Sequence, residues 1–212
     1  MPLLGKIDPD GPVLIKEIEE FRQFLTKNPR GERKEFLPFF AKHPQLGAYL
    51  GTMNDKAAAG TYFATEVSLW GDFTCDLVAG DQSTKAFVFV EFEDASPTSL
   101  FQKITGRKNN LWATRVEHGV SQVIDWLFRI SSEGTSNQME RDFGARQITP
   151  MGLVVVGRSS EVSAYDRQRL DWRSKNTAIQ GAKLAILTYD DLLEWLQGRA
   201  AMLRDLSRAA NP

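Results

Sequence analysis

Cysteine and histidine are scarce in this chain. Among its 212 residues there is one cysteine, Cys75, and there are two histidines, His43 and His118. A single cysteine excludes an intramolecular disulfide and disfavours a structural zinc site, and two histidines exclude a histidine-rich metal site. We therefore expect a reducing compartment, and any metal chemistry would depend on oxygen ligands.

Long apolar runs and phosphate-binding loops are also missing. No apolar run approaches the roughly 20 residues that span a bilayer, and the opening segment 1–6 lacks the apolar core of a signal peptide. We therefore expect a cytoplasmic protein without a membrane partner. The sequence contains neither G-x-x-x-x-G-K-[ST] nor G-x-G-x-x-G, so nucleotide hydrolysis and dinucleotide chemistry have no recognisable motif.

Two glutamates end an otherwise apolar stretch, residues 86–93. With a side-chain period of two, Glu91 and Glu93 share one face of the predicted strand, and apolar side chains fill the other. Upstream, residues 72–78 alternate likewise, and pairing of the two strands through the turn-rich residues 80–83 would bring Asp76 beside both glutamates. Because buried charges are costly, three carboxylates at one sheet edge predict a site for a divalent cation, with Asp76 and Glu91 as ligands.

The order Asp76, then Glu91-x-Glu93, resembles the PD-(D/E)xK nuclease superfamily. Further segments are similar to the nuclease domain of Shedu anti-phage proteins, in the family's order: an opening helix at 35–46, a glutamine helix at 112–126, a core strand at 153–158 and a closing helix at 188–193. The resemblance runs from about Glu35 to about Leu196. It implies an α/β fold with a central mixed β-sheet flanked by helices, as in restriction endonucleases.

The resemblance also implies an activity and its residues. We expect a nuclease that hydrolyses DNA phosphodiesters in anti-phage defence, with Mg²⁺ or Mn²⁺ as cofactor. Asp76, Glu91 and Glu93 would be catalytic, Gln122 would point at the metal site, and Glu35 would hold a water from the helix above. Glu20 stays an alternative to Glu35, because residues 20–29 and 35–44 share a pattern.

Glu93 departs from the family, which has lysine two residues after the motif glutamate. One interpretation makes Glu93 a general base or a ligand of a second cation. A second is an inactive nuclease fold that binds nucleic acid or a partner protein. A third places the three carboxylates at a solvated sheet margin, paired with Arg or Lys.

Net charge does not point to nucleic acid, because 26 Lys and Arg against 27 Asp and Glu give −1. However, residues 95–116 contain no acidic residue, and this segment directly follows the carboxylate strand. It carries four candidate phosphate contacts: Lys103, Arg107, Lys108 and Arg115. An ordinary solvated loop is the alternative.

The remaining pattern indicates a nuclease-like domain over 31–212, preceded by an N-terminal helical extension over 1–30. We expect an antiparallel meander of strands at 62–70, 73–78 and 86–92, and buried strands at 151–156 and 184–187. Helices are expected near 117–130 and 160–175 and after the N-cap Thr188, with a loop over 131–146. His118 and Arg129 are read as a solvated helix flank, and a homo-oligomer is left open.

Overall fold

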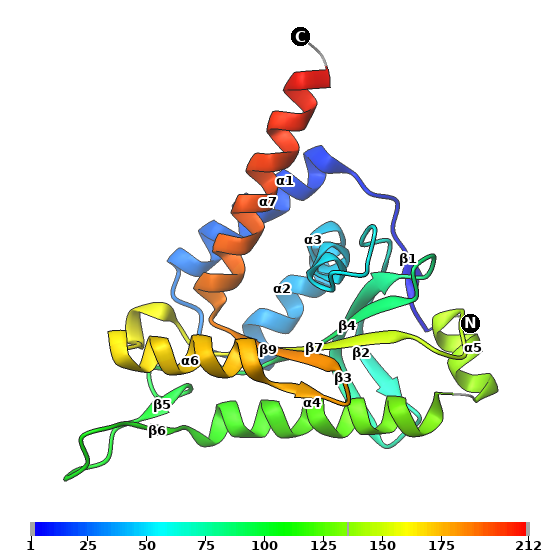
Figure 1. The fold of residues 1–212 in the computed structure, drawn as a ribbon. Coiled ribbons are helices and arrows are strands. Elements are labelled where there is room, and N and C mark those ends of the chain that lie inside the picture. The colour runs from blue at the N-terminus through cyan, green and yellow to red at the C-terminus, as the bar shows by residue number, and fades with distance from the viewer. Residues whose placement is uncertain (1–2, 135, 211–212) are drawn as a thin grey trace.

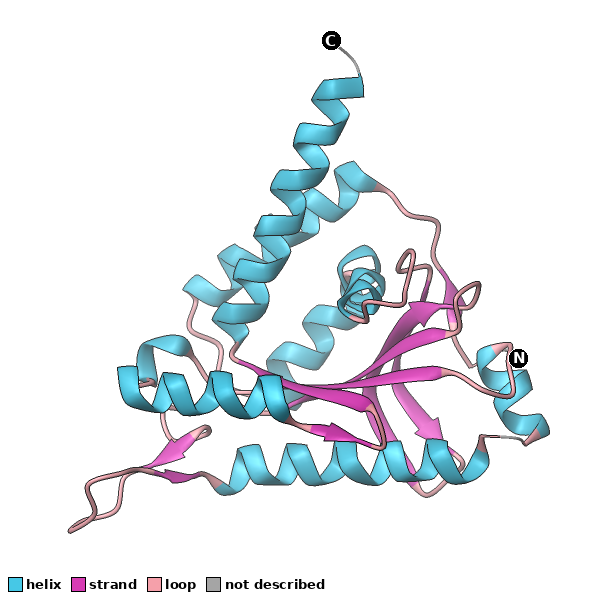
Figure 2. Ribbon diagram, in the orientation of Figure 1, coloured by secondary structure: helices cyan, strands magenta, loops and turns pink. Residues whose placement is uncertain are grey.

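The computed structural model describes residues 3–134 and 136–210. Within this part of the chain a seven-stranded sheet forms the centre, in the order β1-β2-β3-β4-β7-β9-β8 (Figures 1 and 2). Its strands are β1 (Gly5–Lys6), β2 (Tyr62–Leu69), β3 (Phe73–Asp81), β4 (Ala86–Phe92), β7 (Thr149–Val155), β8 (Ala178–Ile179) and β9 (Ala182–Leu187). A separate hairpin consists of β5 (Phe101–Gln102) and β6 (Leu111–Trp112).

The sheet is mixed, as the sequence predicts. Strands β2, β3 and β4 form the antiparallel meander, whereas β4, β7 and β9 run parallel. The β3–β4 register pairs Leu77 with Val90, and the β4–β7 register pairs Val90 with Leu153. The central strands are buried on both faces, which explains their nearly continuous apolar sequences.

Helices cover both faces of the sheet. One face carries α1 (Gly11–Thr26), the π-helical turn η1 (Glu32–Phe36), α2 (Leu37–Lys42), α3 (Pro44–Tyr49), the 3₁₀ turn η2 (Leu50–Met53) and α7 (Tyr189–Ala210). The opposite face carries α4 (Thr114–Glu133), α5 (Asn137–Phe143) and α6 (Ala164–Asn176), and a short 3₁₀ turn, η3 (Ser159–Glu161), precedes α6. The molecule is therefore a three-layer α/β fold.

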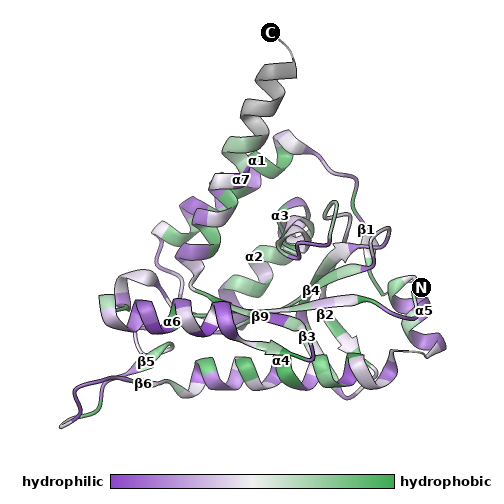
Figure 3. Cartoon of the chain, viewed as in Figure 1, coloured by the Kyte–Doolittle hydropathy of each residue, from purple (hydrophilic) through white to green (hydrophobic). Residues whose placement is uncertain are grey.

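Local sequence signals set the helix boundaries. Helix α1 begins after the N-cap Asp10, whose side chain accepts a hydrogen bond from the Val13 N–H at 3.0 Å. Helix α7 has a capping box, in which the Asp191 N–H donates to Thr188 Oγ1 at 3.0 Å and the Thr188 N–H donates to Asp191 Oδ2 at 2.9 Å. In Figure 3, the ribbon of α4 alternates between hydrophobic and hydrophilic residues along its length, as expected for a helix with one face on the core.

The predicted loop over 131–146 is wrong in its middle. Residues 137–143 form α5, capped by the Ser136 hydroxyl, which accepts from the Met139 N–H at 3.2 Å. Met139 and Phe143 lie four residues apart and are buried against the sheet. The composition of the segment is otherwise polar, and its two apolar residues at helical spacing are the sequence signal for this short helix.

Residues 3–30, part of the predicted N-terminal helical extension, contribute to the same sheet and core as the rest of the described chain. Strand β1 pairs with β2, and α1 packs against α7 with Leu14, Ile18, Phe21 and Leu25 buried. In the described part of the chain, no helix is long and apolar enough to cross a membrane.

Candidate metal centre and active site

The three predicted carboxylates lie close together at the end of the ladder that pairs β3 with β4. Asp76 lies on β3, Glu91 lies on β4 and Glu93 directly follows β4, and their exposed fractions are 7%, 4% and 0%. The Phe92 N–H donates to Asp76 Oδ2 at 2.8 Å, so a side chain replaces a main-chain partner at the end of the ladder. The strand register predicted from the alternation is confirmed in bringing Asp76 beside Glu91.

An irregularity in β2 opens the sheet opposite Asp76. The β2–β3 register pairs Thr65 with Leu77 and Val67 with Cys75 but has no pair at Glu66, whose φ is +51°. A positive φ is uncommon for a residue other than glycine. The interruption leaves Asp76 facing a cavity instead of a continuous ladder.

Helix α4 supplies polar side chains from the opposite side of the site. His118 Nδ1 lies 2.7 Å from Glu93 Oε1, and Gln122 Nε2 donates a hydrogen bond to Glu91 Oε1. Arg115 Nη1 lies 3.5 Å from Glu93 Oε2, and its Nε lies 3.2 Å from Asp94 Oδ2. The spacing of three and four residues places the three side chains on one face of the helix.

Gly119 lets this helix approach the strand closely. A Cβ at this position would lie 3.0 Å from Val154 Cγ1, 3.1 Å from Glu93 Cγ and 3.5 Å from Glu91 Cγ. Any side chain here would push α4 away from both glutamates. The sequence signal is a glycine in a helix interior, where it is otherwise unfavourable.

These groups enclose a cavity of about 160 Å³. The residues that line it come from η1, α2, β2, β3, β4 and α4: Glu32, Arg33, Leu37, Glu66, Thr74, Asp76, Glu91, Arg115, His118 and Gln122. Four predicted residues, Asp76, Glu91, Arg115 and Gln122, are thus joined by two acidic neighbours that the sequence interpretation did not select, Glu32 and Glu66.

Two predicted catalytic residues do not line the cavity: Glu93 is buried beside it and contacts His118, whereas Glu35 lies elsewhere. Glu35 Oε2 accepts hydrogen bonds from the N–H groups of Arg30, at 2.8 Å, and Gly31, at 2.7 Å, and these bonds lower the pKa of the Glu35 carboxyl. Glu32, one helical turn earlier, faces the carboxylates instead, and burial and the charge of Glu93 raise its pKa. Glu20, the alternative, pairs with His43 at 2.9 Å.

His118 was predicted to lie on a solvated helix flank, and the structure adds a contact with a buried carboxylate to that exposed position. Its ring is 56% exposed, yet one nitrogen contacts the fully buried Glu93. The signal available in the sequence was its spacing of four residues from Gln122, which places both side chains on the same face of α4.

Burial and mutual repulsion shift the acidity of the central pair. Burial raises the pKa of Asp76 to about 7, although the hydrogen bond from the Phe92 N–H opposes this. Burial, followed by the charges of Asp76, Glu93 and Glu32, raises the pKa of Glu91 to about 10. The two carboxyls interact directly with each other, so they take up and release protons as a pair. Without a cation, the cluster therefore keeps a proton at neutral pH.

The donor set fits a hard divalent cation. Ligand atoms of Glu91, Glu93 and His118 all lie within 4.8 Å of one another, and this buried acidic cluster could hold a metal ion. Asp76 borders the same cavity from the neighbouring strand. Carboxylate oxygens suit Mg²⁺ and Mn²⁺, and Mn²⁺ also accepts an imidazole nitrogen. A bound cation would replace the proton that relieves repulsion in the cluster.

The four residues predicted to contact phosphate lie in two different regions of the structure. Arg115 reaches the cavity, as described above. Lys103, Arg107 and Lys108 are exposed in the loop between β5 and β6, which projects from the body of the protein (Figure 1).

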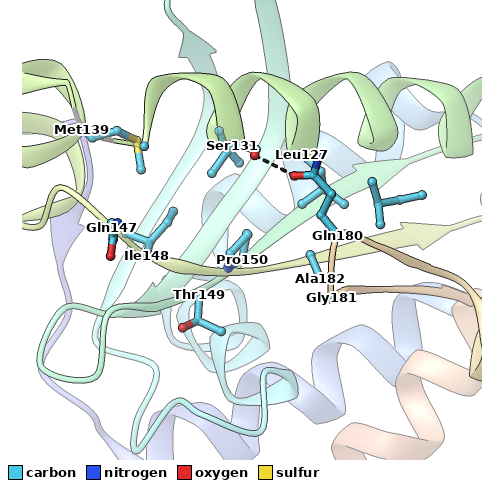
Figure 4. A pocket seen from close by; sticks show the side chains of 13 residues that line it. Leu127, Ser131, Met139, Gln147, Ile148, Thr149, Pro150, Gln180, Gly181 and Ala182 are labelled. Atoms are coloured by element: carbon cyan, nitrogen blue, oxygen red, sulfur yellow. Dashed lines mark hydrogen bonds between the residues drawn. The ribbon is translucent and has the colours of Figure 1, made fainter.

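Another cavity, of about 470 Å³, lies beside the beginning of β7 and the end of α4 (Figure 4). It is lined mainly by apolar side chains, and Ser131 Oγ donates to Gln180 Oε1 at 2.7 Å across its edge. Among the described residues that line it there is no carboxylate, histidine, cysteine or basic side chain. The acid–base and metal-ligating groups are therefore concentrated in the smaller cavity.

Comparisons with known proteins agree with the resemblance seen in the sequence. A family model described as Shedu protein SduA, C-terminal, matches residues 17–193. The match covers most of the chain and includes every residue that lines the carboxylate cavity. No curated protein matches the chain. The chain therefore belongs to the family of Shedu SduA C-terminal domains.

Proposed function

We propose that this protein is a metal-dependent nuclease that hydrolyses DNA phosphodiesters in the cytoplasm. Membership of the Shedu family suggests a role in anti-phage defence. The observation that carries the proposal is the convergence of Asp76, Glu91, His118 and Gln122 around one cavity, with the buried Glu93 in contact with His118. The arrangement is consistent with a PD-(D/E)xK site in which Glu93 occupies the lysine position.

Asp76 and Glu91 would hold Mg²⁺ or Mn²⁺. When bound, the cation lowers the pKa of a water and neutralises charge that develops on the scissile phosphate. The raised pKa values of Asp76 and Glu91 support this role, because carboxyls that resist full ionisation together would be stabilised by a cation.

Glu93 and His118 would manage the proton of the attacking water. Glu93 Oε1 is 2.7 Å from His118 Nδ1, so the ring fixes the direction of the carboxylate. The carboxylate can then accept a proton from the water, and the exposed imidazole ring can pass a proton on to the solvent. Gln122 would orient Glu91 through its amide, and Arg115 would bind a non-bridging phosphate oxygen.

Plasmid cleavage with Mg²⁺ tests the proposal. Asp76→Ala and Glu91→Ala should each abolish cleavage while the fold, followed by circular dichroism, stays intact. Asp72→Ala is a matched control, because Asp72 is exposed and pairs with Arg129 outside the cavity. Cleavage by either site variant at the wild-type rate would refute the assignment.

An inactive, DNA-binding or protein-binding member of the family is the second candidate. One observation favours it: Glu93 stands where the family has lysine, and it is engaged by Arg115 and His118. Calorimetry with Mn²⁺ separates the candidates when combined with cleavage. Metal binding without cleavage of any DNA form would support the inactive fold.

A further inference from the structure

Exposed aromatic side chains and arginines form a continuous surface on α6 and β6. Tyr165 and Trp172, seven residues apart on one face of α6, are 55% and 69% exposed. Together with Trp112, Arg169 and Arg173 they form what we call the aromatic–arginine platform. These five residues and Gln168 line a hollow of about 550 Å³. Large aromatics exposed this far mark interaction surfaces.

The platform is held in place by charge pairs. The guanidinium carbons of Arg169 and Arg173 lie 5.2 Å and 4.7 Å from the Trp112 ring centroid. Glu117 receives two hydrogen bonds from Arg173, at 2.6 Å and 2.9 Å, and Asp166 receives one from Arg169 at 2.8 Å. Because both guanidinium groups are fixed, the flat surfaces around Trp112 are preorganised for stacking.

The platform adjoins both the carboxylate cavity and the basic hairpin. Trp112 precedes Arg115 by three residues, a separation of at most roughly 11 Å along the chain, and Arg115 contacts Glu93. On its other side, a hollow of about 600 Å³ shares Tyr165 with the platform and is also lined by Lys108. A strand that enters from the basic hairpin would cross the platform before it reaches the carboxylates.

We propose that the aromatic–arginine platform binds unpaired bases of a single-stranded DNA segment next to the cleavage site. This proposal rests on the proposed nuclease function and names the form of its substrate. Every base has a face that can stack on an aromatic ring, whereas bases inside a duplex are already stacked and unavailable. Lys103, Arg107 and Lys108 would bind the phosphates of the same strand, since no acidic residue interrupts this segment.

The test measures fluorescence anisotropy of labelled oligo(dT) and of a blunt duplex of equal length, with EDTA present so that no cleavage occurs. Trp172→Ala should weaken binding of oligo(dT) about tenfold and leave duplex binding within about twofold of wild type. Trp172→Phe should retain most of the affinity, because the benzyl ring still stacks. Phe128→Ala is the matched control, since Phe128 is 65% exposed on α4, away from the platform.

Salt dependence provides a second readout. Trp172→Ala should leave the slope of affinity against salt concentration unchanged, because stacking releases few counterions. A Lys103→Ala, Arg107→Ala, Lys108→Ala triple variant should reduce that slope.

Three results would overturn the inference. The first is an unchanged oligo(dT) affinity in Trp172→Ala, and the second is an equal loss of affinity for oligo(dT) and for the duplex. The third is a difference in oligomeric state between Trp172→Ala and the wild type, measured by light scattering. The third would assign the surface to a second copy of the chain. Failure of the nuclease function is distinguishable, because it would remove Mg²⁺-dependent cleavage by the wild type while leaving oligo(dT) binding measurable.

Discussion

Asp76, Glu91 and Glu93 place three acidic groups in a region that is nearly closed to solvent. The partners of these three groups offset their negative charges to different extents. Glu93 contacts His118 and Arg115, whereas Asp76 and Glu91 depend on neutral donors and on each other. The uncompensated repulsion is therefore concentrated in the Asp76–Glu91 pair, and this pair should dominate the pH dependence of the metal-free protein.

Asp76→Asn should stabilise the metal-free protein at pH 9 and flatten its pH dependence. The folded-state pKa of Asp76 is raised to about 7, so the folded state binds this proton more tightly than the unfolded state does. The associated stability is present below the ordinary carboxyl pKa of about 4 and is lost as pH rises through 7, at about 1.4 kcal/mol per pKa unit. Asparagine cannot ionise but keeps an oxygen for the Phe92 N–H. Urea denaturation in EDTA at pH 5 and pH 9 measures the effect.

A wild-type free energy of unfolding that stays constant between these two pH values would contradict this account. Asp72→Asn is the control, because Asp72 is exposed and pairs with Arg129 outside the cavity, so this variant leaves the Asp76–Glu91 pair intact.

Glu93→Lys should abolish Mg²⁺-dependent cleavage. The site in this chain is arranged around a carboxylate: His118 lies 2.7 Å from it, and Arg115 lies 3.5 Å from it. A lysine would face Arg115 with like charge and would free His118 from its partner. Cleavage assays on plasmid and on oligo(dT) measure the loss. Gained activity would show instead that Glu93 marks a silenced nuclease, which favours the second candidate function.

The alternation of strand residues was sufficient to predict Asp76, Glu91 and Glu93 as neighbours. Glu35 was chosen from the family resemblance and not from alternation, and its turn is π-helical, with the Phe36 N–H bonded to the Gly31 carbonyl. A π-turn changes which residue of a helix faces inwards, so Glu32 points to the site and Glu35 caps the turn. Sequence periodicity assumes 3.6 residues per turn and has no means of detecting this change.

Helix α4 is the element that completes the site, because it carries Arg115, His118 and Gln122 against the ends of β4 and β7. Its helical character was predictable from apolar spacing, whereas its distance from the sheet depends on Gly119 and on contacts that the sequence does not display. The sequence was equally insufficient to predict α5 and the β5–β6 hairpin. Each has few apolar residues, and their role in covering the sheet is evident only from the three-dimensional structure.

Gly119→Ala should destabilise the protein and reduce cleavage, although alanine is the better helix former by about 1 kcal/mol. The added Cβ would lie 3.0 Å from Val154 Cγ1 and 3.1 Å from Glu93 Cγ, so α4 must shift away from both glutamates. Thermal unfolding and plasmid cleavage measure the two effects.

Gly198→Ala is the matched control on α7. There an added Cβ meets no heavy atom within 4 Å among the described residues. The substitution therefore changes only the helix propensity, which favours alanine over glycine, and the protein should become more stable. Equal stabilisation by both substitutions would show that α4 does not pack as closely on Glu93 as the structure indicates.

At the scale of the whole molecule, the site lies where the antiparallel meander meets the parallel strands: Asp76 is on β3, and Glu91 is on β4, which pairs antiparallel with β3 and parallel with β7. Two apolar layers enclose the sheet on either face of these strands. A mixed sheet flanked by helices was predictable from strand and helix patterns. The order in which the strands pair, and with it the meeting of η1 and α4 across one cavity, depended on long-range packing.

Because the cluster is built into the central sheet, a cation that binds it should stabilise the entire fold. At a Mn²⁺ concentration 100 times the Kd, linkage adds about 2.7 kcal/mol to the free energy of unfolding, which for a chain of this size raises Tm by roughly 5–10 °C. The increase should be absent in an Asp76→Asn, Glu91→Gln double variant, which keeps the size of the side chains but removes the charges that attract the ion. Asp72→Asn should respond as the wild type does. Scanning calorimetry with increasing Mn²⁺ measures the shift, and an equal shift in the double variant would mean that the ion binds elsewhere on the protein.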